Sequence, residues 1–219
     1  MPFGDALLST TAATQTTNRI FLSFPEQPIH IRVLDTDAQA FVYMAYSLPV
    51  TVNGTKTRRM IPVTSLDNPI AARMRNLSPS DPNYARVQRR MAFNVLVRPR
   101  DEHDTIQQEV KIVDAGPSLV SAIAMYDGKV RNPDRGDLFS EFLTINDFDI
   151  MVHRTGTGLQ TRWVVVPVLT PFGRQPIPAS VYDQRKDPRQ VITFFTNEQI
   201  ERLLDGADYA TVLAEIRKK

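Results

Sequence analysis

Glu109 and Lys111 form the strongest candidate for a catalytic pattern in the chain, because they stand two positions apart shortly after Asp101 and Asp104. Metal-dependent nucleases combine carboxylate ligands with a nearby cation in this way. A solvated strand with alternating charges has the same pattern, so these four residues support a metal-dependent nuclease only as an alternative hypothesis.

The remaining residues give little support to any other kind of catalysis. The chain contains no cysteine, which excludes disulfides, thiolate metal sites and cysteine nucleophiles. Its histidines, His30, His103 and His153, are far apart in the sequence, and the common phosphate-binding, serine-hydrolase and zinc-protease motifs do not occur. We therefore predict a protein that is not an enzyme and that needs neither a metal ion nor a cofactor.

Charge is strongly segregated along the chain, although its 219 residues carry a net charge of only +2. Residues 56–100 contain ten basic and two acidic side chains, and residues 101–150 contain four basic and eleven acidic ones. A basic groove for a polyanion explains this distribution. It is explained equally well if the two blocks neutralise each other, within the fold or across the subunits of a virion or interaction β-domain.

Aromatic residues interleave with the arginines. Single-stranded nucleic-acid binding requires a cationic track for phosphates and exposed rings on which bases stack. Phe93 lies in an apolar run typical of a core, whereas the patterns around Tyr43 and Trp163 fit a surface and a core equally well. The predicted nucleic-acid-binding residues are Tyr43, Tyr46, Lys56, Arg58, Arg59, Arg73, Arg75, Tyr84, Arg86, Arg89, Arg90, Phe93, Arg98, Arg154, Arg162 and Trp163.

Most of the elements that position these residues are predicted to be strands. Apolar residues alternate with polar ones in several short segments, and Asn53-Gly54 predicts a hairpin turn just before the basic run. The predicted strands cover residues 29–33, 41–46, 50–52, 56–59, 91–97, 109–113, 148–154 and 161–168. Residues 155–158, Thr-Gly-Thr-Gly, are the expected turn of a hairpin between the last two.

Helices are predicted where capping signals occur. Asp81-Pro82 predicts a short helix that runs through Arg90 and places Arg86, Arg89 and Arg90 on one face. Pro117 and Ser118 open a second helix. Near the C-terminus, a capping box at 196–199 precedes one helix, and residues 209–216 form another.

These elements predict a mainly β (α+β) fold. Strands that carry arginine next to aromatic residues favour an OB-fold-like barrel of five to six strands with short helices and a helical C-terminal extension, and a β-sandwich is the alternative. We expect a flexible N-terminal arm at 1–18 and an OB-fold core that binds single-stranded DNA at 19–170. A proline-rich linker and C-terminal helices at 171–219 would pack on or near this core.

The order of several segments resembles the single-stranded DNA-binding (helix-destabilising) proteins of tailed phages, an OB-fold family. The segments are FLSFPEQPIHIRVLD, an aromatic strand at 41–46, RRMAFNVLVRPRD, VKIVDAGPSLVSAI and FDIMVHRTGTGLQTRWVVVPV. The resemblance covers roughly residues 19–170, and its most specific part is the last segment, where Trp163 takes the place of an aromatic residue in the family pattern.

The resemblance implies a non-catalytic protein that coats and protects single-stranded DNA during replication or recombination. Phage replication or recombination proteins are then further partners, and the protein is a monomer or self-associates weakly on DNA. Many members hold zinc on cysteines and histidines between the second strand group and the Asn-Val strand, whereas residues 49–77 here contain neither. Some also have a basic N-terminal arm and an acidic tail, and this chain has no basic residue before Arg19 and ends in Arg-Lys-Lys.

Two further features concern membranes and location. No apolar stretch approaches the ~20 residues that span a bilayer. The N-terminus also lacks the basic and apolar regions of a signal peptide. We therefore expect no membrane association and, with the phage resemblance, the cytoplasm of the bacterial host.

Overall fold

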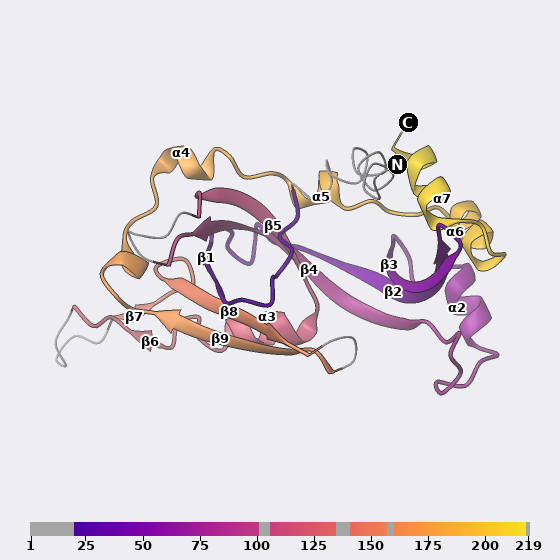
Figure 1. The fold of residues 1–219 in the computed structure, drawn as a ribbon, viewed down its shortest axis with the longest axis horizontal. Helices are drawn as coiled ribbons and strands as arrows, with labels where there is room; N and C mark the ends of the chain where they lie inside the picture. Colours follow the sequence, from indigo (N-terminus) through magenta and orange to yellow (C-terminus); the bar gives the residue numbers. More distant parts are fainter. Residues whose placement is uncertain (1–19, 101–105, 135–140, 157–159, 218–219) are drawn as a thin grey trace, which may run out of the picture. The chain divides into compact units, whose positions relative to one another are not determined.

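The computed structural model describes residues 20–100, 106–134, 141–156 and 160–217. The chain divides into two compact units, shown as ribbons in Figure 1. Unit 1 comprises residues 1–41 and 91–188, and unit 2 comprises residues 42–90 and 189–219. Each unit is therefore assembled from segments that are distant in sequence.

A seven-stranded sheet supplies most of the structure. Its order is β3-β2-β4-β1-β8-β9, with β5 also paired to β4, and a separate two-stranded sheet joins β6 and β7. The strand pairs with a defined register are all antiparallel. The strands are β1 (Ile29–Val33), β2 (Phe41–Val52), β3 (Thr55–Val63), β4 (Arg86–Arg98), β5 (Glu109–Ala115), β6 (Val130–Arg131), β7 (Phe142–Leu143), β8 (Asp149–Thr155) and β9 (Arg162–Val168).

Unit 1 has its own apolar core. Alternate residues of β1, β4 and β8, such as Ile31, Val95 and Ile150, are buried beneath α3 (Pro117–Ala124), which contributes Leu119 and Ile123. After β9 the chain continues through η2 (Phe172–Arg174) and α4 (Ala179–Tyr182), and α5 (Pro188–Val191) begins at the last residue of unit 1. The apolar residues of this core alternate because they share one face of the sheet, and β4 is buried on its other face as well from Ala92 to Arg98.

Unit 2 combines the β2–β3 hairpin with three helices. These are α2 (Pro69–Met74), α6 (Asn197–Leu204) and α7 (Tyr209–Ile216). Leu48 and Ile61 from the hairpin are buried with Ile70, Ile200 and Val212 from the helices. The C-terminal helices therefore complete the core around residues 42–90, which carry eight of the thirteen basic residues of unit 2.

Several local predictions are confirmed. Asn53 and Gly54 both have positive φ (49° and 78°) at the tip of the β2–β3 hairpin, as a tight turn requires. The capping box at Thr196 and Gln199 opens α6, and Asp208 caps α7. β8 and β9 pair as a hairpin, with Asp149 opposite Val168 at one end and Thr155 opposite Arg162 at the other. Part of the expected turn, residues 157–159, lies outside the described residues.

The helix predicted at 82–90 is wrong, because residues 86–90 begin strand β4. Asp81 makes a turn instead of a helix cap: its carboxylate accepts a hydrogen bond from the Asn83 amide at 2.7 Å, and its carbonyl accepts one from the Tyr84 amide at 2.9 Å. In a strand, successive side chains point to opposite sides. Arg86 and Arg90 therefore share one face of β4, and Arg89 lies on the other.

The mainly β class is confirmed, but a barrel is not. Neither sheet closes on itself within the described residues. The expected division at residues 18 and 170 also differs from the two units, and the arm at 1–18 lies outside the described residues. In the part of the chain that is described, no helix is long and apolar enough to cross a membrane.

Candidate nucleic-acid interface

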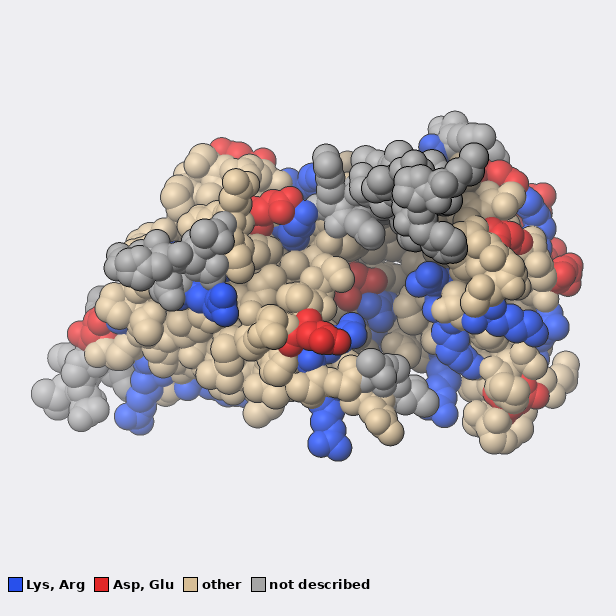
Figure 2. All heavy atoms as spheres, in the orientation of Figure 1, with Lys and Arg blue, Asp and Glu red and all other residues tan. Residues whose placement is uncertain are grey.

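Positive charge is concentrated in unit 2. Its sequence contains thirteen basic and seven acidic side chains, a balance of +6, whereas unit 1 has a balance of −4. Figure 2 shows Lys and Arg side chains gathered over the part of unit 2 that Figure 1 labels β2, β3 and α2. The basic block at 56–90 thus lies on a unit with excess positive charge, and the acidic block at 101–150 lies on the other unit.

The β2–β3 hairpin places three basic residues on its two faces. Lys56 pairs with Thr51 and Arg58 pairs with Pro49, so both project from one face. Arg59 pairs with Leu48 and projects from the opposite face, where Leu48 enters the unit 2 core. All three basic side chains are exposed.

Two of the predicted arginines hold the fold of unit 2 together. Arg58 donates hydrogen bonds to the carbonyls of Ser47 (2.8 Å), Pro82 (2.7 Å) and Tyr84 (3.1 Å). Arg73 donates one to the carbonyl of Leu204 at 2.8 Å. These contacts connect the hairpin to the 82–84 turn and α2 to the end of α6, so both guanidinium groups have a structural role.

Five other predicted cations are exposed and make no hydrogen bond or ion pair with the described residues. Arg75 caps the end of α2, and the remaining four come from β3 and β4. They are Lys56, Arg59, Arg75, Arg86 and Arg89. Arg90 is half-buried and interacts within the structure. Those on the strands lie on both faces of β3 and β4, and together we call the five exposed cations the basic surface.

Most of the predicted stacking residues are not exposed, which corrects the sequence-based expectation. Tyr43 and Tyr46 are each 6% exposed, and Phe93 is 5% exposed within the unit 1 core. Tyr84 is half-buried against the unit 2 core. Trp163 is half-buried on unit 1, with Phe24 packed edge-on at 5.0 Å between ring centroids. A continuous platform for bases is therefore not formed by these five rings.

Arg98 is also buried, and its partner is a carboxylate of its own unit. Its Nε lies 3.3 Å from Asp149, which also accepts a 2.8 Å hydrogen bond from Arg32 Nε. Burial raises the pKa of Asp149, and the two guanidinium groups oppose that shift. Burial likewise lowers the pKa of Arg32, and Asp149 opposes it. The cluster anchors η2, because Arg32 bonds the Gly173 carbonyl and Arg98 that of Phe172.

The last two predicted arginines, Arg154 and Arg162, lie on unit 1. Arg154 pairs with Trp163 and is half-buried, whereas Arg162 pairs with Thr155 and is exposed. Paired residues project from the same face, so the two arginines lie on opposite faces of the β8–β9 hairpin. They belong to a different unit from the basic surface.

The alternative nuclease site receives no support. Lys111 lies 2.5 Å from the Glu109 carboxylate, so these two side chains form an ion pair on β5. Asp101 and Asp104 lie outside the described residues. Among the residues that the structure describes, no group of three or more metal-ligating side chains occurs.

Tyr209 on α7 is partly buried against the core of unit 2. Burial raises the pKa of its hydroxyl, and Arg59 and Arg217 oppose the shift. The neutral phenol therefore contributes stability that is fully present below the unfolded pKa of 10.0 and is lost as pH rises through the higher folded value.

We expect the alkaline titration of this tyrosine to be visible in absorbance near 295 nm. The native protein should contain a phenol that ionises at higher pH than free tyrosine, and Tyr209→Phe should remove its contribution. A difference spectrum between the two proteins that titrates at the ordinary tyrosine pKa would contradict this assignment.

Sequence reasoning missed the role of the C-terminal segment in positioning the hairpin. Asp208 accepts a 2.6 Å hydrogen bond from the Asn53 amide at the hairpin tip, while its other carboxylate oxygen caps α7. Asp208 was recognisable as a helix cap, but nothing local in the sequence indicated a contact 155 residues away.

Comparison with known proteins does not identify a family. No protein-family model matches the chain, and no curated protein matches it.

Proposed function

We propose that this protein binds single-stranded DNA without catalysing a reaction, and that the basic surface of unit 2 carries the binding. One observation carries the proposal: five exposed cations without hydrogen-bond or ion-pair partners in the described structure lie on a unit whose balance is +6. Neutralisation of phosphates by such side chains releases condensed counterions, which drives association with nucleic acid.

Burial of the aromatic residues alters the expected mechanism. With Tyr43, Tyr46 and Phe93 inside the fold, phosphate contacts supply most of the affinity, and stacking is limited to the half-buried Tyr84 and Trp163. Binding should then depend little on base sequence, because phosphates are the same in every sequence. The resemblance to phage helix-destabilising proteins supports single strands as the target and replication or recombination as the setting.

Titration of the protein with labelled oligothymidine tests the proposal. Fluorescence anisotropy at about 50 mM salt should show binding that weakens steeply as salt increases. A mixed-sequence strand should bind with similar affinity. A duplex of equal length should bind more weakly, because its bases are stacked on each other and cannot stack on Tyr84 or Trp163. Tighter binding to the duplex would contradict a single-strand function, and absence of binding to all three would favour the interaction-domain alternative.

A further inference from the structure

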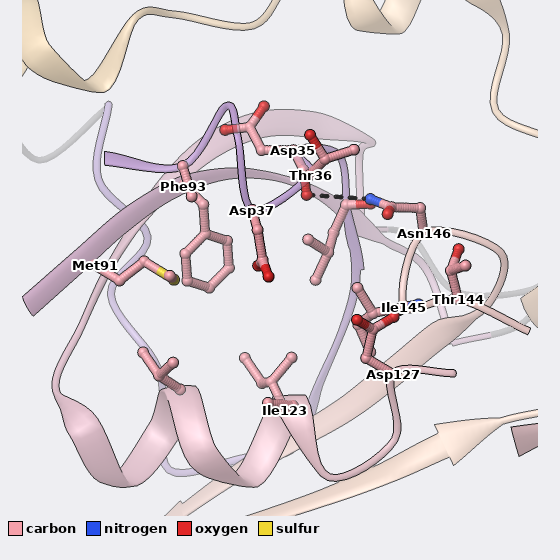
Figure 3. Close-up of a pocket in the computed structure, with 14 residues that line it drawn as sticks. Asp35, Thr36, Asp37, Met91, Phe93, Ile123, Asp127, Thr144, Ile145 and Asn146 are labelled. Atoms are coloured by element: carbon pink, nitrogen blue, oxygen red, sulfur yellow. Dashed lines mark hydrogen bonds between the residues drawn. The ribbon is translucent and has the colours of Figure 1, made fainter. Parts of the chain in front are cut away.

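Unit 1 contains an apolar cavity of about 300 Å³ that the proposed nucleic-acid function does not use. Figure 3 shows how its walls meet: Phe93 and Met91 come from β4, and Ile123 comes from α3. Asp35 and Asp37 follow β1, and Asp127 follows α3. The volume lies at the lower end of the range of small-molecule pockets.

The walls of this cavity are fixed by hydrogen bonds. Asn146 donates to the carbonyls of Val33 at 3.0 Å and Asp35 at 3.3 Å, which holds the 144–146 loop against the end of β1. The Ile145 amide donates to Asp127 at 2.9 Å, which holds the same loop against the end of α3. The cavity is therefore preformed and does not depend on a ligand for its shape.

Charge around the cavity has one sign. All the charged residues that line it are aspartates. Asp35 is 5% exposed and lies 3.3 Å from Arg185, so its charge is balanced within unit 1. Asp37 and Asp127 are exposed, and neither forms an ion pair with a described residue. In Figure 3 the Asp37 carboxylate is directed into the cavity beside Phe93, and the Asp127 carboxylate lies against Ile145, whose amide donates to it.

We propose that this cavity binds a small organic cation, an ammonium group carried on an aromatic or branched alkyl body. The body fills the apolar space between Phe93, Val120 and Ile123, and the ammonium lies between Asp37 and Asp127. A neutral ligand would bury the same apolar area but leave the two carboxylates unpaired. An anion would be repelled by both of them.

Three probes with the same aromatic body test the charge requirement: phenethylamine, 2-phenylethanol and 3-phenylpropionate. Methyl NMR signals of Met91, Val120, Ile123 and Ile145 report on occupancy. The amine should shift these signals and bind ~5-fold more tightly than the alcohol, because each of two exposed ion pairs adds a small favourable free energy. The carboxylate should not bind. Equal shifts for amine and carboxylate, or no shift with any probe, would overturn the proposal.

Two variants separate charge from shape. Asp37→Asn combined with Asp127→Asn should reduce the affinity for phenethylamine to that for 2-phenylethanol and leave the alcohol unaffected. Ala124→Trp places a large ring from an exposed position of α3 over the cavity and should abolish binding of both. Native affinity for the amine in the double asparagine variant, or any binding of the amine to Ala124→Trp, would contradict the assigned site. No nucleic acid is present in these experiments, so their outcome is independent of the proposed function.

Discussion

Replacing Asn94 by alanine is expected to lower the free energy of unfolding by ~2–4 kcal/mol, because buried polar partners lose their hydrogen bonds and a small cavity is left. Asn94 lies on β4 and is 2% exposed. Its Nδ2 donates to Asp35 and to the Lys186 carbonyl, both at 2.9 Å, and its Oδ1 accepts from the Lys186 amide at 3.0 Å. One side chain thus connects the sheet to the segment before α5.

Thermal unfolding measures this loss. For a chain of this size, ~2–4 kcal/mol corresponds to a decrease in Tm of roughly 5–15 °C. Asn76→Ala is the matched control, since Asn76 is exposed and its side chain makes no hydrogen bond with the described residues. Hydrogen exchange near Lys186 should accelerate in Asn94→Ala and stay unchanged in the control. Equal Tm values for the two variants would show that Asn94 does not hold this segment.

Turns and caps were predictable from the sequence because their causes are local. Asn53-Gly54 tolerates positive φ, and the Thr196 hydroxyl accepts from the Gln199 amide only three residues away. The strand pattern was predictable for a related reason, since apolar residues that share one face of a sheet alternate along the strand. The same reasoning failed at Asp81-Pro82, where a turn and a helix start have the same local signature and pairing in the sheet decides between them.

Exposure of the candidate site residues depended on distant parts of the chain. Tyr43 is covered by Phe194, whose ring centroid lies 6.0 Å away and 151 positions later in the sequence. Arg98 is paired with Asp149, which lies 51 positions later in the sequence. The division into units has the same origin, because the C-terminal helices complete the core around the hairpin. No local pattern could have distinguished these residues from exposed ones.

Arg58 and Arg59 illustrate how the structure separates neighbours that are equivalent in sequence. Arg58 donates to three carbonyls of unit 2, whereas Arg59 makes no hydrogen bond within the described residues. Removal of Arg58 therefore affects the fold as well as the surface charge. A test of phosphate binding should use only cations whose loss leaves the fold of unit 2 intact.

Combined replacement of Lys56, Arg59 and Arg89 by alanine is expected to reduce the affinity for oligothymidine ~100-fold at 0.1 M salt. When fewer phosphates are contacted, binding releases fewer counterions. The slope of log affinity against log salt should therefore become less steep by ~0.7 per charge, or about 2 in total. The melting temperature should change little, because all three side chains are exposed and make no hydrogen bond or ion pair with described residues.

A charge-matched variant of unit 1 distinguishes a localised surface from a general effect of net charge. Lys129, Arg131 and Lys186 are exposed and belong to unit 1, and their replacement by alanine changes the net charge by the same amount. If the basic surface contacts the phosphates, this variant keeps the native salt slope, because its cations do not displace counterions. Equal loss of slope in both variants would mean that the protein attracts nucleic acid only through its overall charge, and the basic surface would have no special role in binding.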